Sequence, residues 1–266
     1  RQQRQQKRHR YVLEEPRIPF ECEVLYENDA IIVVDKPHFL ATTPRGMWYR
    51  ETALIRLREQ YGEPDIVPAH RLDRLTAGIV VFVRKPELRG AYQMLFQNRK
   101  TIKTYECLAP LAPEQHPQYG TIVRIEGINP FRQSEHRIFA RIAGRLQAYE
   151  IPETINAQTL IERGSTVRCI DGKAYVNYVL HPKNRQKTHQ LRVHMNSLGI
   201  ADFWGDDFYP NIVQRSYDDF SQPLDWWLVS YVSRSGDGRA SYIRFESAAW
   251  LINGLISRYC SLNQDI

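Results

Sequence analysis

The sequence has no hydrophobic run long enough to cross a membrane and no cysteine spacing typical of a metal site. Its longest apolar runs, such as residues 79–83, contain about five residues, whereas a spanning helix needs about 20. No apolar stretch follows the basic N-terminus, so we expect no secretory signal. The four cysteines (Cys22, Cys107, Cys169 and Cys260) form no CxxC pair, which argues against a zinc ribbon and suits reduced thiols in a cytoplasmic protein.

Fingerprints of nucleotide, metal and serine-hydrolase sites are also missing. None of the patterns GxxxxGK[ST], GxGxxG, HExxH and GxSxG occurs in the chain. His189 and His194 are five positions apart, which is a poor spacing for two metal ligands on one helix face. We therefore expect no metal, and the usual nucleotide-binding fingerprints are absent.

Positive charge is concentrated at the start of the chain. The 266 residues, enough for one large domain or two small ones, carry a net charge of +6. The first ten residues hold five basic residues and no acidic one, and without them 31 basic residues face 30 acidic ones. We expect residues 1–20 to form a basic, disordered tail that contacts polyanions, residues 21–250 the folded body, and residues 251–266 a C-terminal tail.

The body itself has basic and acidic segments. Residues 84–103 contain six basic residues and a single acid, and residues 183–194 contain four basic residues and no acid. Residues 202–225 instead contain six aspartates and one arginine. The basic segments fit either a face that binds a polyanion or ordinary solvated surface.

Apolar patterning indicates a sheet with a few helices. Amphipathic spacing predicts helices at residues 51–61, 86–98 and 188–198. Strands are predicted at residues 30–34, 79–83, 102–108, 122–125, 137–142, 166–170 and 174–180, with two late strands around Tyr231 and Tyr242. Because the strands come in runs rather than in strict alternation with helices, the pattern favours an α+β fold with an antiparallel-rich sheet.

The most unusual stretch is residues 68–78, with the sequence PAHRLDRLTAG directly before an apolar strand. Asp73 lies between Arg71 and Arg74, and neighbouring cations favour its ionised form. An ionised, positioned carboxylate can act as a nucleophile toward an electrophilic carbon. The same residues are also compatible with a loop aspartate held in a salt bridge.

Two further stretches are rich in groups that recognise nucleic acid. Arg192, in the run KTHQLRVH, could pair with a carboxylate or a phosphate, or else belong to an exposed basic helix face. Tyr105 follows a basic stretch and could stack on an unpaired base, or else be a buried strand tyrosine.

Taken in order, these motifs resemble those of an RluA-type pseudouridine synthase. The resemblance rests on His70-Arg-Leu-Asp73 with Thr76 and Gly78, Lys103-x-Tyr105, and His189-Gln-Leu-Arg-x-His194. The segments at residues 30–37 and 205–209 resemble two other family motifs, so the likeness spans about residues 22–247. Departures include Phe39 where the family pattern KPxG has glycine, and Ala77 where serine is usual.

The resemblance implies a pseudouridine synthase catalytic fold, a long mixed, mostly antiparallel sheet with flanking helices and a central RNA cleft. It implies that the protein is an isomerase that converts uridines of large-subunit ribosomal RNA, transfer RNA or both into pseudouridine without a cofactor. Asp73 matches the catalytic aspartate, Tyr105 the tyrosine that stacks on the target base, and Arg192 the arginine that pairs with that aspartate. Arg71 matches the arginine that fills the vacancy left by the flipped base, and Leu191 an apolar position of the pocket. We expect a cytoplasmic monomer with RNA as its partner, without a membrane or a protein partner.

Two other functions remain open at this level. An N-glycosidase or another hydrolase could use Asp73, although such enzymes usually need a second carboxylate or an activated water. A protein that kept the fold could bind RNA without catalysis. The route of the chemistry is open as well, because Asp73 could attack C1′ of the ribose or abstract the C2′ proton.

Overall fold

The computed structural model describes residues 15–97, 101–110, 122–127, 157–170, 172–182, 189–198, 226–233 and 243–246, together with residues 200, 213, 216 and 218–220. Its elements in chain order are β1 (Glu23–Glu27), β2 (Ile31–Lys36), α1 (Ala53–Tyr61), β3 (Val67–Pro68), β4 (Ala77–Val83), the 3₁₀ helix η1 (Pro86–Leu88), α2 (Arg89–Gln97), β5 (Thr101–Pro110), β6 (Ile122–Gly127), β7 (Ala157–Ile170), β8 (Lys173–Pro182), α4 (Gln190–Ser197), β9 (Trp226–Ser233) and β10 (Ile243–Glu246). The strand expected at residues 137–142 and the motif at residues 205–209 lie outside the described residues.

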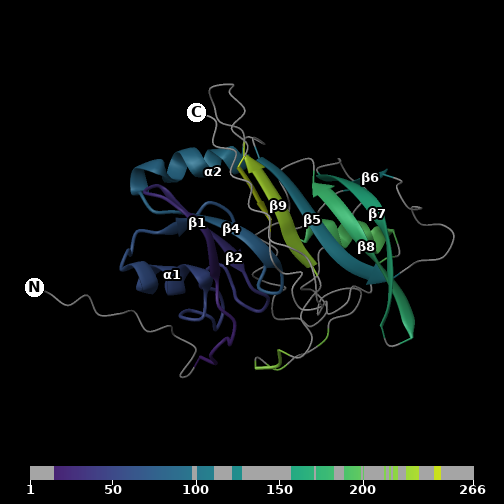
Figure 1. The fold of residues 1–266 in the computed structure, drawn as a ribbon, viewed down its shortest axis with the longest axis horizontal. Helices are drawn as coiled ribbons and strands as arrows, with labels where there is room; N and C mark the ends of the chain where they lie inside the picture. Colours follow the sequence, from purple (N-terminus) through teal and green to yellow (C-terminus); the bar gives the residue numbers. More distant parts are fainter. Residues whose placement is uncertain are drawn as a thin grey trace, which may run out of the picture.

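The strands of the described residues form one ten-stranded sheet. Its order is β1-β2-β4-β9-β5-β8-β7-β6, with β3 paired to β4 and β10 paired to β9. Within the described strands, β4 and β9 run parallel and the other pairs are antiparallel. Figure 1 shows α1 and α2 beside the β1–β2–β4 half, and β6, β7 and β8 at the other end. The mixed, mostly antiparallel sheet expected from the sequence is confirmed.

The central strands of the first half explain its stability. Every residue of β4 is buried, and so are Ile31, Ile32, Val33 and Val34 of β2. Continuous apolar runs of this kind suit strands that are covered on both faces. The start of β4 therefore provides a rigid attachment point for the loop that precedes it, which contains Asp73.

The two predicted helices of this half form with shifted ends. α1 begins after Thr52, whose side chain accepts a hydrogen bond from the backbone N–H of Ile55, and ends at Gly62. The helix predicted at residues 86–98 is divided into η1 and α2, because Pro86 opens a separate turn. No helix in the described part of the chain is long and apolar enough to cross a membrane.

Residues 15–20 pack against α1 and the loop before it, although the sequence assigned them to the basic tail. Ile18 is fully buried, and its carbonyl accepts a hydrogen bond from Arg56 of α1. The Glu15 carboxylate accepts backbone N–H bonds from three successive residues, Tyr49, Arg50 and Glu51, at 2.7–2.9 Å. An apolar residue and a carboxylate thus attach this segment to the body, whereas residues 1–14 lie outside the described chain.

Candidate active site

The Asp73 loop connects β3 to β4 and is fixed at both ends. On the β3 side, the backbone N–H of Ala69 donates to Val81 O at 2.8 Å, and the N–H of Val81 donates to His70 Nε2 at 3.2 Å. Burial, followed by the positive charge of Lys103, holds the pKa of His70 well below its usual range. His70 is therefore a neutral acceptor that replaces a backbone carbonyl. On the β4 side, the Thr76 N–H donates to Asp73 O at 3.1 Å and closes a turn.

The end of β2 and the segment after it form hydrogen bonds with the same loop. The ammonium group of Lys36 is fully buried and donates to the carbonyls of Pro37, Leu40 and Arg74 at 2.9, 2.7 and 3.4 Å. Desolvation lowers its pKa to about 7, although nearby acidic groups including Asp73 oppose the shift. These bonds connect the end of β2 directly to the residue that follows Asp73.

Two further contacts hold the residues around Asp73. The Thr42 hydroxyl donates to Leu72 O at 2.9 Å and accepts from the Leu72 N–H at 3.2 Å. His38 Nδ1 donates to Leu75 O at 2.8 Å. The backbone on both sides of Asp73 is thus hydrogen-bonded to the segment after β2, and its carboxylate projects from a rigid loop.

The structure brings Arg192 to Asp73. Arg192 Nη1 lies 3.6 Å from Asp73 Oδ2, and the Nε2 atom of His189 lies 4.0 Å from the same oxygen. The arginine side chain is 3% exposed, whereas that of Asp73 is 52% exposed. Desolvation by itself raises the pKa of Asp73, but Arg192, then His189 and Lys36, lower it, and the net pKa lies below its ordinary value of 3.8. The site therefore presents an ionised carboxylate with one side open to solvent.

Side chains on another face of α4, the helix that carries Arg192, contact Thr159 of β7. Gln190 Nε2 donates to Thr159 Oγ1 of β7 at 3.1 Å, and His194 Nδ1 lies 2.8 Å from the same oxygen. Desolvation lowers the pKa of His194 to about 4, so this imidazole is neutral at pH 7 and Nδ1 can accept the single hydroxyl proton. Gln190 and His194 are four positions apart and so share a helix face. The motif HQLRVH thus directs Gln190 and His194 to β7 and Arg192 to Asp73.

Tyr105 lies near the start of β4 because β9 pairs with β4 on one side and with β5, which carries Tyr105, on the other. Leu228 of β9 pairs with Gly78 of β4 on one side and with Tyr105 of β5 on the other. Strands are spaced by about 4.8 Å, so the Cα atoms of Tyr105 and Gly78 are about 10 Å apart. Tyr105 is 2% exposed in this structure and belongs to the core cluster, so a base that stacks on it would have to displace its neighbours.

The remaining predicted site residues occupy different environments. Leu191 is buried in the same core cluster as Leu72 and Tyr105, whereas the side chain of Arg71 is exposed to solvent. Sequence reasoning gave no role to Lys36 or Thr42, which brace the loop. Lys36 was visible only as part of a matching motif, because a buried lysine has no signature distinct from an exposed one.

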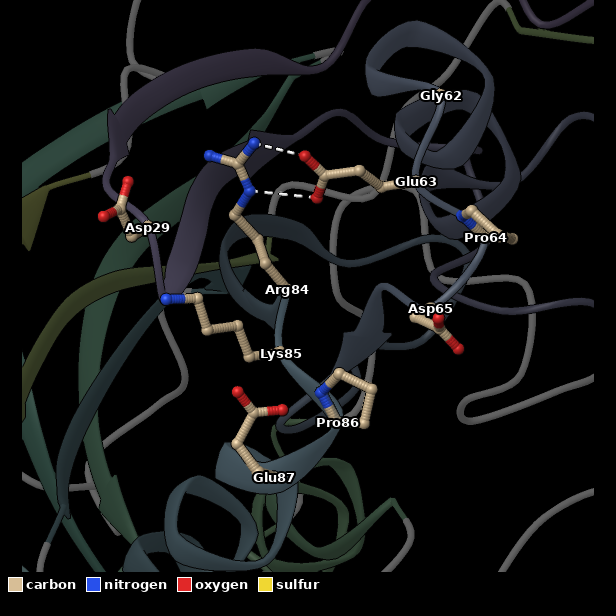
Figure 2. A pocket seen from close by; sticks show the side chains of 9 residues that line it. All are labelled: Asp29, Gly62, Glu63, Pro64, Asp65, Arg84, Lys85, Pro86 and Glu87. Carbon is tan, nitrogen blue, oxygen red and sulfur yellow. Dashed lines mark hydrogen bonds and ion pairs between the residues drawn. The ribbon is translucent and has the colours of Figure 1, made fainter.

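The described residues contain no group of three His, Cys, Asp or Glu side chains that could hold a metal ion. The pocket shown in Figure 2 is lined by Asp29, Gly62, Glu63, Pro64, Asp65, Arg84, Lys85, Pro86 and Glu87. Four of its lining residues, 84–87, directly follow the C-terminal end of β4, whereas Asp73 precedes the N-terminal end of that strand. A strand of this length spans about 20 Å. This pocket is therefore separate from the candidate site, whose chemistry depends on the carboxylate and the cations around it.

Comparisons with known proteins show the family to which the chain is related. A family model described as RNA pseudouridylate synthase matches residues 30–197, a range that includes Asp73, Tyr105 and Arg192. The dual-specificity RNA pseudouridine synthase RluA of Vibrio parahaemolyticus is 29% identical over 220 residues, which cover 78% of this chain and 81% of that protein. The tRNA pseudouridine synthase C of the same species is 26% identical over 184 residues, with coverages of 68% and 70%. The solved structure of human RNA pseudouridylate synthase domain containing 1 covers 88% of this chain and 86% of its own, with a TM-score of 0.64 and 19% identity.

Proposed function

The chain belongs to the RNA pseudouridylate synthase family, and we propose that Asp73 is the carboxylate that starts the isomerisation of uridine. The observation that carries the proposal is the 3.6 Å approach of the buried Arg192 guanidinium to the half-exposed Asp73 carboxylate. This pairing keeps Asp73 charged while leaving one side of it open to a substrate. An N-glycosidase would also need a positioned water or a second carboxylate, and the groups around Asp73 are cationic instead.

The reaction rearranges bonds without a change of redox state. The N1–C1′ bond of uridine breaks, the uracil rotates, a C5–C1′ bond forms, and a base removes the proton from C5. Asp73 could attack C1′ or abstract the C2′ proton, and both routes need its ionised form. Arg192 holds Asp73 in that form and in one orientation.

We propose the remaining roles from the matching motif positions. Tyr105 stacks on the target uracil and is a candidate base for the C5 proton, and Leu191 lines the apolar part of the pocket. Arg71 fills the vacancy that the flipped nucleotide leaves, a role that its solvent-exposed side chain permits. Because the uridine must leave its stack to reach Asp73, unpaired loops and bulges are favoured over duplex.

The substrate that we propose is transfer RNA, large-subunit ribosomal RNA or both. The names of two relatives support this range, since one is a dual-specificity RNA pseudouridine synthase and the other a tRNA pseudouridine synthase. We further propose that the protein acts as a cytoplasmic monomer, with residues 21–250 as one catalytic domain between the terminal segments 1–20 and 251–266. The free thiols of Cys22 and Cys107 agree with a reducing compartment.

Mapping of pseudouridine in total RNA tests the proposal. Cells that lack the gene are complemented with the wild-type protein or with Asp73→Asn, and RNA is sequenced after a chemical treatment specific for pseudouridine. We expect one or a few sites in tRNA or large-subunit rRNA that return only with the wild-type protein. Sites that return equally with Asp73→Asn would exclude Asp73 as the catalytic carboxylate, and an unchanged map would contradict the proposed substrates.

A further inference from the structure

An exposed arginine lies at the end of a tight turn next to Asp73. The backbone N–H of Arg45 donates to Trp48 O at 3.0 Å, and the N–H of Trp48 donates to Arg45 O at 3.1 Å. These paired bonds enclose two residues, Gly46 and Met47, and Gly46 has the positive φ of 60° that such a turn requires. Arg45 therefore has a fixed backbone even though its side chain is exposed to solvent.

The turn is attached to the Asp73 loop on both sides of the aspartate. Thr42, three residues before Arg45, is hydrogen-bonded to Leu72 in both directions. Trp48, three residues after Arg45, lies under the guanidinium of Arg74, whose central carbon is 4.9 Å from the ring centroid. Since Leu72 and Arg74 flank Asp73, the turn is attached to the Asp73 loop at two points.

The residues that follow the turn are also fixed by hydrogen bonds. The Glu15 carboxylate accepts the backbone N–H groups of Tyr49, Arg50 and Glu51, directly after Trp48. Charge-assisted bonds to three successive amides are among the stronger contacts that a loop can form. Contacts with Leu72, Arg74 and Glu15 therefore hold the segment that contains the turn.

The side chain of Arg45 forms no ion pair with any residue that the structure describes. Its positive charge nevertheless acts on Asp73, because it is one of the groups that lower the pKa of that carboxyl. An exposed guanidinium on a rigid support can hold a phosphate through two parallel hydrogen bonds with little loss of loop entropy.

We propose that Arg45 binds a backbone phosphate beside the target uridine and thereby positions the RNA strand over Asp73. The proposal rests on the proposed role of Asp73. Arg45 is then a substrate-binding residue that the sequence motifs do not include. Arg45 would recognise the phosphate group next to the uridine, and every RNA substrate has such a phosphate.

The test compares Arg45→Gln with Lys85→Gln, which removes the same charge at the opposite end of β4, in the pocket of Figure 2. RNA affinity is measured at several salt concentrations with a stem-loop that contains a mapped target site. For Arg45→Gln we expect affinity to fall by about tenfold and the slope of log K against log salt to flatten by about 0.7. The loss should fall on affinity rather than on the single-turnover rate at saturating RNA, and Lys85→Gln should resemble the wild type.

An unchanged salt slope would overturn the proposal, above all if the acid limb of the rate–pH profile moved upward, because Arg45 would then act only through Asp73. Equal losses in the two variants would also overturn it, since they would reveal a diffuse charge effect. The affinity measurement involves no chemistry. A failure of the role assigned to Asp73 would therefore leave the result for Arg45 readable.

Discussion

At the scale of single residues, the pair formed by Arg192 and Asp73 joins a buried cation to a half-exposed carboxylate. A buried guanidinium is unfavourable unless a negative group compensates it, so Asp73 compensates the charge of Arg192, and Arg192 keeps Asp73 ionised. The lowered pKa of Asp73 means that the carboxylate stays ionised at any pH well above 3.8. The rate of the enzyme should therefore show no loss from Asp73 protonation near neutral pH.

We predict that Arg192→Lys loses far more rate than RNA affinity. Lysine keeps the charge but not the planar, two-pronged donor geometry, so the pKa of Asp73 should rise and the acid limb of the rate–pH profile should move to higher pH. Single-turnover rates and RNA binding across pH measure both effects. Arg84→Lys is the matched control, because Arg84 pairs with Glu63 beyond the far end of β4. An unmoved acid limb with a near-normal rate in Arg192→Lys would identify Arg192 as a phosphate contact instead.

Phe39 illustrates a different residue-scale effect. Its φ of 65° lies in the left-handed region, which explains why the KPxG pattern has glycine at this position. The buried Phe39 ring packs against Phe20 and Phe220 with centroid distances of 6.1 and 5.3 Å, and Arg74 lies 5.7 Å from its centroid. Ring packing thus offsets the backbone strain.

We predict that Phe39→Gly destabilises the protein by about 1–4 kcal/mol. Loss of a buried phenyl ring removes about 3–5 kcal/mol, and relief of the left-handed conformation returns about 1–2 kcal/mol. Chemical denaturation measures the difference. Phe39→Leu, which keeps the strain and most of the apolar volume, should lose less than Phe39→Gly. A glycine variant as stable as the wild type would show that the ring contributes nothing.

At the scale of elements, the position of α4 depends on its attachment to β7. Thr159 is fully buried and its hydroxyl contacts both Gln190 and His194. The orientation of Arg192 toward Asp73 should therefore depend on this hydroxyl.

We predict that Thr159→Val lowers the free energy of unfolding by about 1–3 kcal/mol, because it removes the buried hydroxyl that bonds to the side chains of Gln190 and His194. The saturated single-turnover rate should fall as well, since α4 can then shift and weaken the pairing with Asp73. Thr159→Ser keeps the hydroxyl and serves as the control. If Val and Ser variants lost the same rate, the hydroxyl would not position the helix.

The elements also differ in how well the sequence predicted them. The strands at residues 30–34 and 79–83 and the helix at residues 51–61 were predicted within a few residues, because continuous apolar runs mark the strands and apolar residues at helical spacing mark the helix. β1 was missed, since Glu23 and Glu27 flank three half-buried residues and leave no clear alternation. Only the second half of β7 was predicted, because Gly164 and a register shift interrupt its pattern.

At the scale of the whole molecule, the sheet brings together motifs that are far apart in the chain. Asp73 and Arg192 are separated by more than one hundred residues, and Tyr105 reaches the start of β4 only through β9. Residue types and motif order were enough to nominate all three. The bracing by Lys36, Thr42 and Thr159 could not be predicted, because it consists of long-range hydrogen bonds that no local pattern encodes.

The basic N-terminal segment belongs to this scale as well. Residues 1–10 contain five basic side chains. Farther along the chain, Glu15 is hydrogen-bonded to Tyr49, close to the turn that carries Arg45. We predict that deletion of residues 1–10 flattens the salt dependence of RNA binding by about 0.7 for each single-strand phosphate that the segment neutralises. The saturated single-turnover rate should change little, and a large drop in that rate would show that the segment takes part in the chemistry.

The central claim is that Asp73 supplies the carboxylate, and release of tritium from RNA labelled at uridine C5 tests it most directly. The label leaves only when C5 bonds to C1′, so the assay follows the isomerisation itself. Asp73→Asn is nearly isosteric but carries no charge. We predict a single-turnover rate at saturating RNA that is lower by at least about 10³-fold, with RNA affinity close to that of the wild type. Tritium release at a comparable rate by a variant that binds RNA normally would contradict the account.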